Sequence, residues 1–542
     1  MEDPIQNLST DPVVTRPIIV DPTFSKSSTS SNMFVTELSP TMTITLALLL
    51  SAFLYFISKP NKQKGYKPLP GPKGVPLFGN MFDLPKSRPW VKMEEWTRQY
   101  GPIYKLKLGR REMIVLGRAD VALALLDKRS AIYSSRPRMI MTGELVSRNL
   151  RMTFMPYGDL WRRQRKLLHQ LTSPKAASSY EPIQEQESAQ IVRDMIKTPK
   201  NYWGHCQRYA GSTIMQVGFN KRAATPNHHA ITEMRAVNEE MTKTAVAGRY
   251  IVDSLPFLNY LPKPLAPWKQ EADALFDKTL TLFSKYFNEV RDNVANGDDT
   301  HCFTKEILRQ QSSYGLKDEE AIFLAGAMFG AGSDTTSDGI STFLLTMVAH
   351  PHVLKRAQEE LDTVVGQTRM PDFTDQSDLI YCNAIVKEVL RWRTIIAGGL
   401  AHSTTEDDVF EGYFIPKGTT VLANHWSIHL DPELYPEPTK FNPDRFIDSN
   451  GQLNDLKHFA FGFGRRICPG MHIAERSLFI VFSRLMWACN ITNAKDEQGQ
   501  IIPIDVDRFS EGFSSHPVGF QCDIKSRGPW VDEVVELATA GM

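Results

Sequence analysis

The chain has 542 residues, 42% of them hydrophobic and 23% charged, a composition that supports a large buried core and excludes disorder for most of its length. A formal net charge of +1 at pH 7 leaves no basic excess, so we expect no nucleic-acid partner. The six cysteines contain no Cys-x-x-Cys pair, so neither a zinc framework nor a disulfide scaffold is indicated.

The first 40 residues are polar and rich in Ser, Thr and Pro, which predicts a disordered leader at 1–40. Its acidic residues argue against a mitochondrial presequence, which would be rich in Arg and poor in acids. Asn7 begins an Asn-Leu-Ser sequon, so a lumenal leader would make the chain a glycoprotein.

An uncharged run, TMTITLALLLSAFLYFI, covers 17 residues from Thr41 to Ile57. At about 1.5 Å per residue a helix of this run reaches about 25 Å and predicts a transmembrane anchor at 41–58. The alternative, a cleaved signal peptide, would start nearer the N-terminus and end in small residues. Lysines are concentrated after the run, so we expect a single-pass protein of the endoplasmic reticulum membrane, in contact with lipid, with its main body cytosolic.

A connector rich in Pro and Gly follows the anchor, PLPGPKGVP at 68–76. Fixed proline dihedrals and permissive glycines predict a stiff, bent linker rather than a helix or strand. We therefore expect a basic, then Pro/Gly-rich hinge at 59–80 that spaces the main body from the membrane. The main body is expected at 81–526, followed by a C-terminal tail at 527–542.

Helical periodicity dominates the main body. Helices are predicted near 90–100 and 160–170, and strand-like runs at 103–108 and 112–116. The Gly109-Arg110-Arg111 sequence between the two strands suits a hairpin turn. A second hairpin is predicted over 409–423, around the sequence IPKGTT at 415–420.

An apolar stretch from Asp318 to Ala349 has the length of a central helix. It contains glycines at 326, 330, 332 and 339, each of which costs about 1 kcal/mol relative to alanine in a helix. We therefore expect a compensating interaction along this helix.

The most informative segment is FGFGRRICPG at 461–470. Its glycines let the backbone approach a flat cofactor, and two arginines precede Cys468. Nearby positive charge and backbone N–H groups stabilise a thiolate and tune its electron donation to a metal. The alternative for a single cysteine is inert core packing, which these neighbours disfavour.

This segment resembles the haem-ligand loop of the cytochrome P450 superfamily. The matches are Phe461, Gly464, Arg466, Cys468 and Gly470. The resemblance covers about 68–522. It implies a mainly α-helical fold with a small β region that binds heme b. In this chain we expect one transmembrane helix before that fold. The resemblance also implies that Cys468 is the axial ligand of the haem iron, that Phe461 shields the haem, and that Arg466 contacts a propionate. A thiolate ligand favours O–O cleavage.

The sequence Glu388-Val389-Leu390-Arg391 places an acid and a base on one helix face, because residues i and i+3 are neighbours. Followed by FNPDRF at 441–446, it resembles the family's structural triad, here Glu388, Arg391 and Arg445, which braces the haem loop. The alternative is an ordinary surface ion pair, which contributes little.

Within the central helix, AGSDTT at 331–336 resembles the family's oxygen-activation motif. The resemblance implies that Asp334 and Thr335 are catalytic, that the helix opens over the haem, and that Gly332 allows close approach. A carboxylate and a hydroxyl in that position can relay protons to dioxygen. The alternative is that both side chains only bond the helix backbone.

Trp161 and Arg165 stand at i and i+4 on one helix face, and the resemblance implies that both contact haem propionates. His402 resembles a strand position where the family often places a basic propionate partner, although a structural histidine is an equal alternative. His425 and His429 have the spacing of a zinc helix but lack its Glu, so we interpret them as structural.

The resemblance implies a monooxygenase that inserts one atom of dioxygen into an apolar substrate, with electrons from NADPH-cytochrome P450 reductase. The pattern near 406–413 and the cysteine loop are similar to fungal enzymes of secondary metabolism, including those similar to O-methylsterigmatocystin oxidoreductase. Catabolic hydroxylases of aromatic compounds share this pattern, so that alternative stays open. A haem-thiolate isomerase is disfavoured by the intact Asp334 and Thr335, and a non-catalytic haem-binding protein would show a damaged motif.

Substrate contacts are expected from loops, because loops on a rigid scaffold carry specificity. The expected segments are 136–157, the central helix near Phe329 and Ala331, 394–400 and 509–514. They contain Met139, Ile140, Met141, Phe329, Ile395 and Ile396, which indicates an apolar ligand.

Overall fold

The computed structural model describes residues 44–45, 51, 65–109, 111–246 and 248–540. Contacts divide the chain into one unit of residues 1–62 and a second of residues 63–542. The predicted leader and most of the predicted anchor lie outside the described residues, and Ile44, Thr45 and Ser51 of the anchor are helical. Within these described ranges, no helix combines the length and apolar character needed to cross a membrane.

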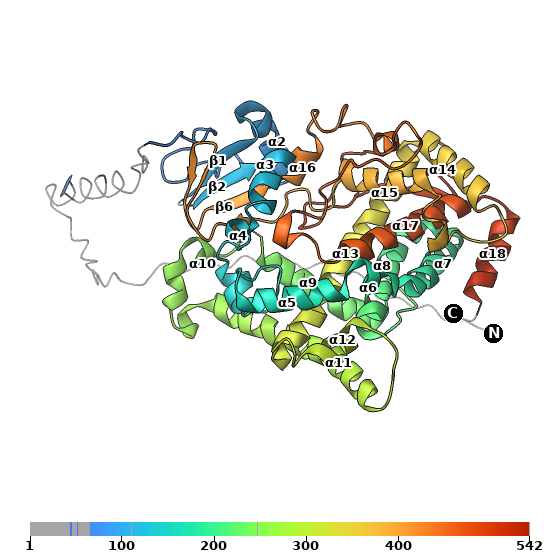
Figure 1. Ribbon diagram of the computed structural model, residues 1–542, viewed down its shortest axis with the longest axis horizontal. Helices are drawn as coiled ribbons and strands as arrows, with labels where there is room; N and C mark the ends of the chain where they lie inside the picture. Colours follow the sequence, from blue (N-terminus) through green and yellow to red (C-terminus); the bar gives the residue numbers. More distant parts are fainter. Residues whose placement is uncertain (1–43, 46–50, 52–64, 110, 247, 541–542) are drawn as a thin grey trace, which may run out of the picture. The chain divides into compact units, whose positions relative to one another are not determined.

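The second unit is mainly helical with small sheets, as the sequence predicts (Figure 1). Its longer helices are α2 (Pro89–Tyr100), α5 (Asp159–Leu171), α7 (Glu181–Lys197), α8 (Tyr202–Phe219), α9 (His229–Thr244), α11 (Pro267–Ala295), α12 (Phe303–Gln310), α13 (Asp318–Ala349), α14 (Pro351–Val364), α15 (Ile380–Trp392), α17 (Met471–Ala488) and α18 (Pro529–Thr539). Shorter helices are α3 (Ala119–Ala122), α4 (Ser130–Tyr133), α6 (Pro174–Ser178), α10 (Ile251–Ser254) and α16 (His425–His429). The strands are β1 (Ile103–Leu108), β2 (Arg111–Leu116), β3 (His402–Ser403), β4 (Asp408–Phe410), β5 (Tyr413–Ile415), β6 (Thr420–Ala423), β7 (Cys489–Asn493) and β8 (Cys522–Ser526).

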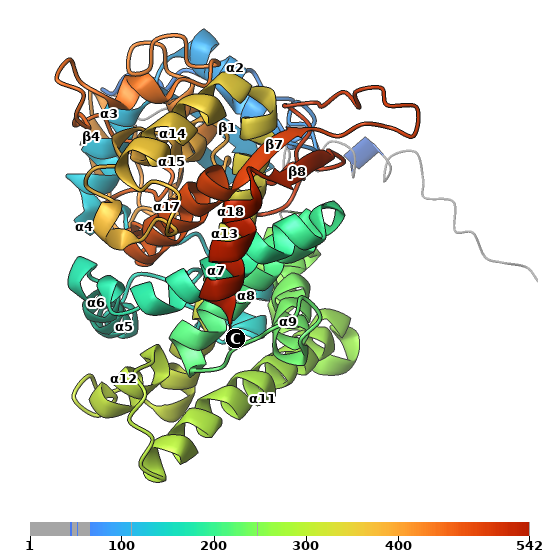
Figure 2. The same cartoon turned by 90° about the vertical axis from the view of Figure 1, so that its right-hand side faces the viewer.

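Helix α13 covers the predicted range and runs through the middle of the unit (Figures 1 and 2). A Cβ on Gly326 would lie 2.2 Å from the ring of Phe283 in α11, and one on Gly332 would lie 2.7 Å from Ile214 in α8. The glycines therefore let neighbouring helices approach closely, which compensates for their low helix propensity. Gly332 allows the close approach of α8, whereas the expected opening of the helix is not seen, since α13 is continuous from Asp318 to Ala349.

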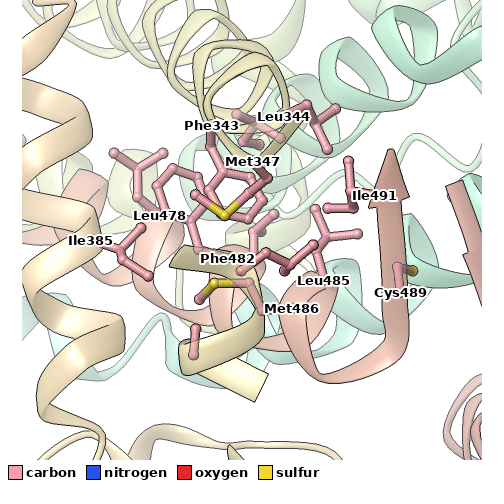
Figure 3. Close-up of a cluster of buried hydrophobic side chains, with 14 of the residues drawn as sticks. Phe343, Leu344, Met347, Ile385, Leu478, Phe482, Leu485, Met486, Cys489 and Ile491 are labelled. Atoms are coloured by element: carbon pink, nitrogen blue, oxygen red, sulfur yellow. The ribbon is translucent and has the colours of Figure 1, made fainter. Parts of the chain in front are cut away.

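The largest hydrophobic core lies between α13, α15, α17 and β7 (Figure 3). The rings of Phe343 in α13 and Phe482 in α17 stack with centroids 4.0 Å apart. Helix α18 also belongs to this core through Val531 and Val535 and packs against α7. The predicted tail at 527–542 thus contains a packed helix, because apolar residues at i and i+4 give it one buried face.

The sheets confirm one predicted hairpin and correct the other. Strands β1 and β2 pair as an antiparallel hairpin, and the sheet continues in the order β1-β2-β6-β3. The second predicted hairpin is wrong in its turn, because β4 pairs with β5 and β6 pairs with β2 and β3. The hairpin of β4 and β5 turns at Glu411-Gly412. These residues have φ of 49° and 85°, the left-handed conformation that tight hairpins require.

The described part of the hinge is irregular, as predicted, but it lies on the sheet. The backbone N–H of Lys105 in β1 donates to the carbonyl of Pro70 at 2.8 Å. A Cβ on Gly71 would lie only 2.2 Å from the Lys105 carbonyl oxygen, so glycine permits this close approach. The segment from residue 65 onward is therefore attached to the main body.

Candidate active site

A cavity of about 640 Å³ lies between α13 and the loop that carries Cys468. Its walls include Trp161, Arg165, Asp334, Thr335, His402, Phe461, Arg466 and Cys468. Residues predicted from four separate segments of the sequence thus meet at one site. Gly464 and the predicted triad of Glu388, Arg391 and Arg445 do not line the cavity.

The cysteine loop is held by its own backbone and by a neighbouring helix. The N–H of Cys468 donates to the carbonyl of Phe461 at 2.8 Å, which closes the loop. Gly464 has a φ of 55°, and a Cβ there would lie 2.0 Å from the carbonyl oxygen of Leu126. Only glycine fits this position, so Gly464 fixes the loop against the π-helix Leu123–Asp127.

The positive charge near the Cys468 sulfur comes from Arg165 of α5. Burial raises the pKa of the Cys468 thiol, while the N–H of Gly470 and the charge of Arg165 lower it. Arg165 also donates to the carbonyl of Ile467 at 2.7 Å. Arg465 instead donates to the Tyr157 hydroxyl, so the expectation that both preceding arginines stabilise the thiolate is wrong.

One wall of the cavity carries three guanidinium groups. Arg466 donates to the carbonyls of Ser134, Met152 and Met155 at 2.7–2.9 Å. Burial, with the nearby charges of Arg136 and Arg165, lowers the pKa of Arg466 to about 8. Burial also lowers the pKa of Arg136 to about 10. Among the described residues, no carboxylate lies within ion-pair distance of these three arginines.

Trp161 and His402 complete this cationic wall. Arg466 lies over the Trp161 ring, 4.4 Å from its centroid, and the buried indole Nε1 has no partner in the described part of the chain. The Nδ1–H of His402 donates to the carbonyl of Tyr133 at 2.8 Å. Burial, together with Arg136, lowers the pKa of His402 to about 3, so this histidine is neutral. An N–H donor without a partner among cations without a carboxylate suits an anionic group, and a haem would supply two carboxylates.

On the α13 side, the two predicted catalytic residues have different partners. The Asp334 carboxylate accepts from the Asn238 amide of α9 at 2.8 Å. The Thr335 hydroxyl donates to the carbonyl of Ala331 at 2.7 Å, which is the backbone bonding considered as the alternative. Burial and the nearby Asp338 raise the pKa of Asp334, and such upward shifts are typical of carboxyls that exchange protons.

The three residues of the predicted triad contact one another. Glu388 pairs with Arg391 at 2.6 Å and with Arg445 at 3.1 Å. Arg391 also donates to the carbonyl of His429, and His429 Nε2 accepts from the N–H of Phe459 at 2.8 Å. The ion pair is therefore connected to the start of the cysteine loop through His429.

Helix α16 explains the pair of histidines with zinc-like spacing. His425 and His429 are both buried, and His429 forms the link to Phe459 described above. No cluster of three or more metal-ligating side chains occurs in the described ranges. His429 therefore makes a structural contact, and His425 lines the cavity.

Some of the residues expected to contact the substrate line the cavity, and others do not. Ala331, Ile395 and Ile396 line the cavity, and so do residues of the 510–514 loop. Ile140, Met141 and Phe329 instead lie in hydrophobic clusters, each at most 2% exposed. Asn238 and the cationic role of Arg136 were missed, since neither belongs to a local motif.

Comparison with known proteins identifies close relatives along most of the chain. The family model described as Cytochrome P450 matches residues 69–522. Cytochrome P450 monooxygenase 58 of Postia placenta is 37% identical over 504 residues, covering 91% of this chain and 94% of the relative. A cytochrome P450 monooxygenase of Armillaria gallica is 37% identical over 476 residues, covering 86% and 91%. Cytochrome P450 monooxygenase virE of Hypocrea virens is 36% identical over 491 residues, covering 88% of each chain.

Proposed function

The chain belongs to the cytochrome P450 family and is a haem-dependent monooxygenase with a thiolate-ligated iron, and on this premise we propose which residues serve its reaction. Cys468 is the proposed axial ligand, because it is the only described cysteine that lines the cavity. The bound haem supplies the activation of dioxygen. Arg136, Arg165, Arg466 and the Trp161 indole N–H would hold the two propionates.

Proton delivery is assigned to Asp334 and Thr335. Both side chains line the cavity, and burial raises the pKa of Asp334, which favours a carboxyl that exchanges protons. The Thr335 hydroxyl can pass that proton on when it rotates away from the Ala331 carbonyl. This pair distinguishes a monooxygenase from a haem-thiolate isomerase, which needs neither external electrons nor protons; NADPH consumption with added reductase separates the two.

The Cys468 assignment carries the proposal and has a direct spectroscopic test. The reduced carbon-monoxide difference spectrum of the purified protein should show a thiolate-type Soret band, and Cys468→Ala should lose it. Cys489→Ala is a matched control, because that buried cysteine lies in β7 and does not line the cavity. A histidine-type band in well-folded wild-type protein would refute the assignment.

The proposed electron donor is NADPH-cytochrome P450 reductase. Helix α5 lies beside the cysteine loop, as the bond between Arg165 and the Ile467 carbonyl shows. Its outer face exposes Arg162, Lys166 and His169, which favours an acidic partner. Salt should therefore slow reduction of the enzyme, and charge reversal at Arg162 and Lys166 should remove most of this dependence.

The proposed substrate is an apolar organic compound, a fungal secondary metabolite in the first instance. Ile214, Ile395, Ile396 and Leu478 line the cavity and favour apolar surface. The alternative is a catabolic hydroxylase of small aromatic compounds. Spectral titration with polycyclic metabolites and with single-ring aromatics distinguishes the two, since the better-fitting class displaces water from the cavity and binds more tightly.

The proposed location is the endoplasmic reticulum membrane, with residues 63–542 cytosolic and a lumenal leader glycosylated at Asn7. An exposed apolar surface supports lipid contact. It comprises Val75, Leu77, Phe78, Met81, Phe82, Ile251, Leu255, Phe257, Tyr260 and Leu265. The two halves of this lipid-facing surface meet at the β1–β2 turn, where Gly109 donates to the Phe78 carbonyl and Arg111 to the Asp253 carbonyl. Such an apolar surface is typical of membrane contact.

A further inference from the structure

The Asp334 carboxylate is held by a residue from a different helix. Asn238 of α9 donates from Nδ2 to Asp334 Oδ2 at 2.8 Å, and both side chains line the cavity. No other hydrogen bond to the Asp334 carboxylate is formed within the described ranges. The orientation of this carboxylate therefore depends on Asn238.

Gly330 provides the space that the Asn238 amide occupies. A Cβ on Gly330 would lie 2.2 Å from Asn238 Oδ1 and 2.7 Å from its Cγ. Gly326 and Gly332 make room for apolar side chains, whereas Gly330 makes room for a polar one. The Asn238 amide is thus fixed from both ends, by the bare α13 backbone at Gly330 and by the carboxylate one turn later at Asp334.

The charged groups around Asp334 do not fix its position. Asp338 lies one turn along α13, Arg235 lies on α9, and His516 reaches in from the C-terminal loop. His516 pairs with Asp338 at 3.1 Å, and Arg235 donates to Gln207 at 3.0 Å. These groups change the electrostatic potential at Asp334, while Asn238 alone contacts its oxygen.

We propose that Asn238 is a positioning residue that holds the Asp334 carboxylate at the cavity wall. We also propose that the Asn238 amide can occupy this position only because residue 330 is glycine. This inference rests on the proposed role of Asp334 in proton delivery. Asn238 occupies one carboxylate oxygen and leaves the other to exchange a proton. The alternative is an ordinary contact between α9 and α13 without effect on proton transfer.

The packing of the Asn238 amide against Gly330 is tested first by thermal unfolding, which does not depend on catalysis. Gly330→Ala should be more stabilising in the Asn238→Ala background than in wild type, because the added methyl then meets no amide and alanine favours the helix. Gly326→Ala is the matched control: its methyl meets the Phe283 ring, so it should be equally destabilising in both backgrounds. Equal changes in thermal stability on Gly330→Ala in the two backgrounds would refute the packing of the Asn238 amide against Gly330.

The positioning role is tested with the haem-loaded full chain, reductase, NADPH and dioxygen. The fraction of electrons released as hydrogen peroxide is measured against pH. A hydrogen bond to the ionised carboxylate lowers its pKa, so Asn238→Ala should move the midpoint upward by about one pH unit. Gly330→Ala should move it in the same direction, and Asn238→Ser, which keeps a donor, should restore part of the shift.

The reference enzyme is Asp334→Asn, whose peroxide fraction should lose this pH dependence. If the peroxide fraction of Asp334→Asn varies with pH as in wild type, the proton-delivery role is refuted and the positioning role with it. This holds even if the thermal measurements support the packing of Asn238 against Gly330. An unchanged midpoint in Asn238→Ala, with a response in Asp334→Asn, overturns the role of Asn238 alone. The two failures are therefore distinguishable.

Discussion

Glu388 and Arg391 form an ion pair in which neither side chain is exposed to solvent. Arg391 Nε and Nη2 donate to the two carboxylate oxygens of Glu388 at 2.6 and 2.8 Å. Arg391 also donates to the backbone carbonyls of His429, Pro438 and Lys440. The guanidinium therefore connects α15 to the segment that leads into the cysteine loop.

We expect Arg391→Ala to lower the free energy of unfolding by about 3–5 kcal/mol, because it leaves the Glu388 charge buried with fewer partners. Chemical unfolding of the purified protein measures this loss. Arg356→Ala is the matched control, since its ion pair with Asp444 is half exposed on both sides and should contribute at most about 1 kcal/mol. Similar losses in the two variants would contradict the assigned importance of the buried pair.

Trp161→Phe separates the two contributions of the indole ring. The phenyl ring can keep the contact with Arg466, but it lacks the Nε1–H that has no described partner in the cavity. If that N–H binds a propionate, its loss should speed haem dissociation about tenfold, the effect of one hydrogen bond to a charged group. Transfer of haem to an excess of apomyoglobin gives the rate.

The control for this substitution is Trp203→Phe, which also lies in the cavity wall but stacks on His516. Its haem dissociation rate should stay near that of wild type. A Trp161→Phe enzyme that retains haem as well as Trp203→Phe would refute the indole–propionate contact.

Buried neutral histidines predict a loss of stability in mild acid. Burial lowers the pKa of His425 to about 4, whereas in the unfolded chain it is about 6.5. Between these values the unfolded state binds a proton that the folded state does not, so stability falls as pH falls below about 6.5. The slope contributed by His425 approaches 1.4 kcal/mol per pH unit.

Unfolding free energies at pH 7.5 and 5.5 measure this dependence. His425→Asn should reduce the difference between the two pH values, whatever its own effect on stability. His169→Asn, at an exposed position of α5, serves as the control and should leave the difference unchanged. An identical pH dependence in His425→Asn would show that this histidine does not stay neutral in the fold.

The sequence predicts those parts of the site that lie within short motifs. Local sequence patterns predict Cys468, the Glu388–Arg391 pair and the range of α13, because each pattern lies within one loop or one helix. Asn238 could not be predicted, because it reaches Asp334 across 96 residues only after α9 packs on α13. The direction of the Arg466 side chain could not be predicted either, because it donates to carbonyls of Ser134, Met152 and Met155, which lie far from it in the sequence.

The proposed lipid-facing surface makes a prediction about the full chain in nanodiscs. Tyr260 is 91% exposed in this surface, and Leu537 is 79% exposed on α18, at the other end of the unit from α10 in Figure 1. Lipids with brominated acyl chains should therefore quench a tryptophan placed by Tyr260→Trp at least about twice as strongly as one placed by Leu537→Trp, because aromatic rings favour the membrane interface. Equal quenching of the two variants would refute the surface, whereas strong quenching at position 260 alone would orient residues 63–542 with the β1–β2 turn toward the bilayer.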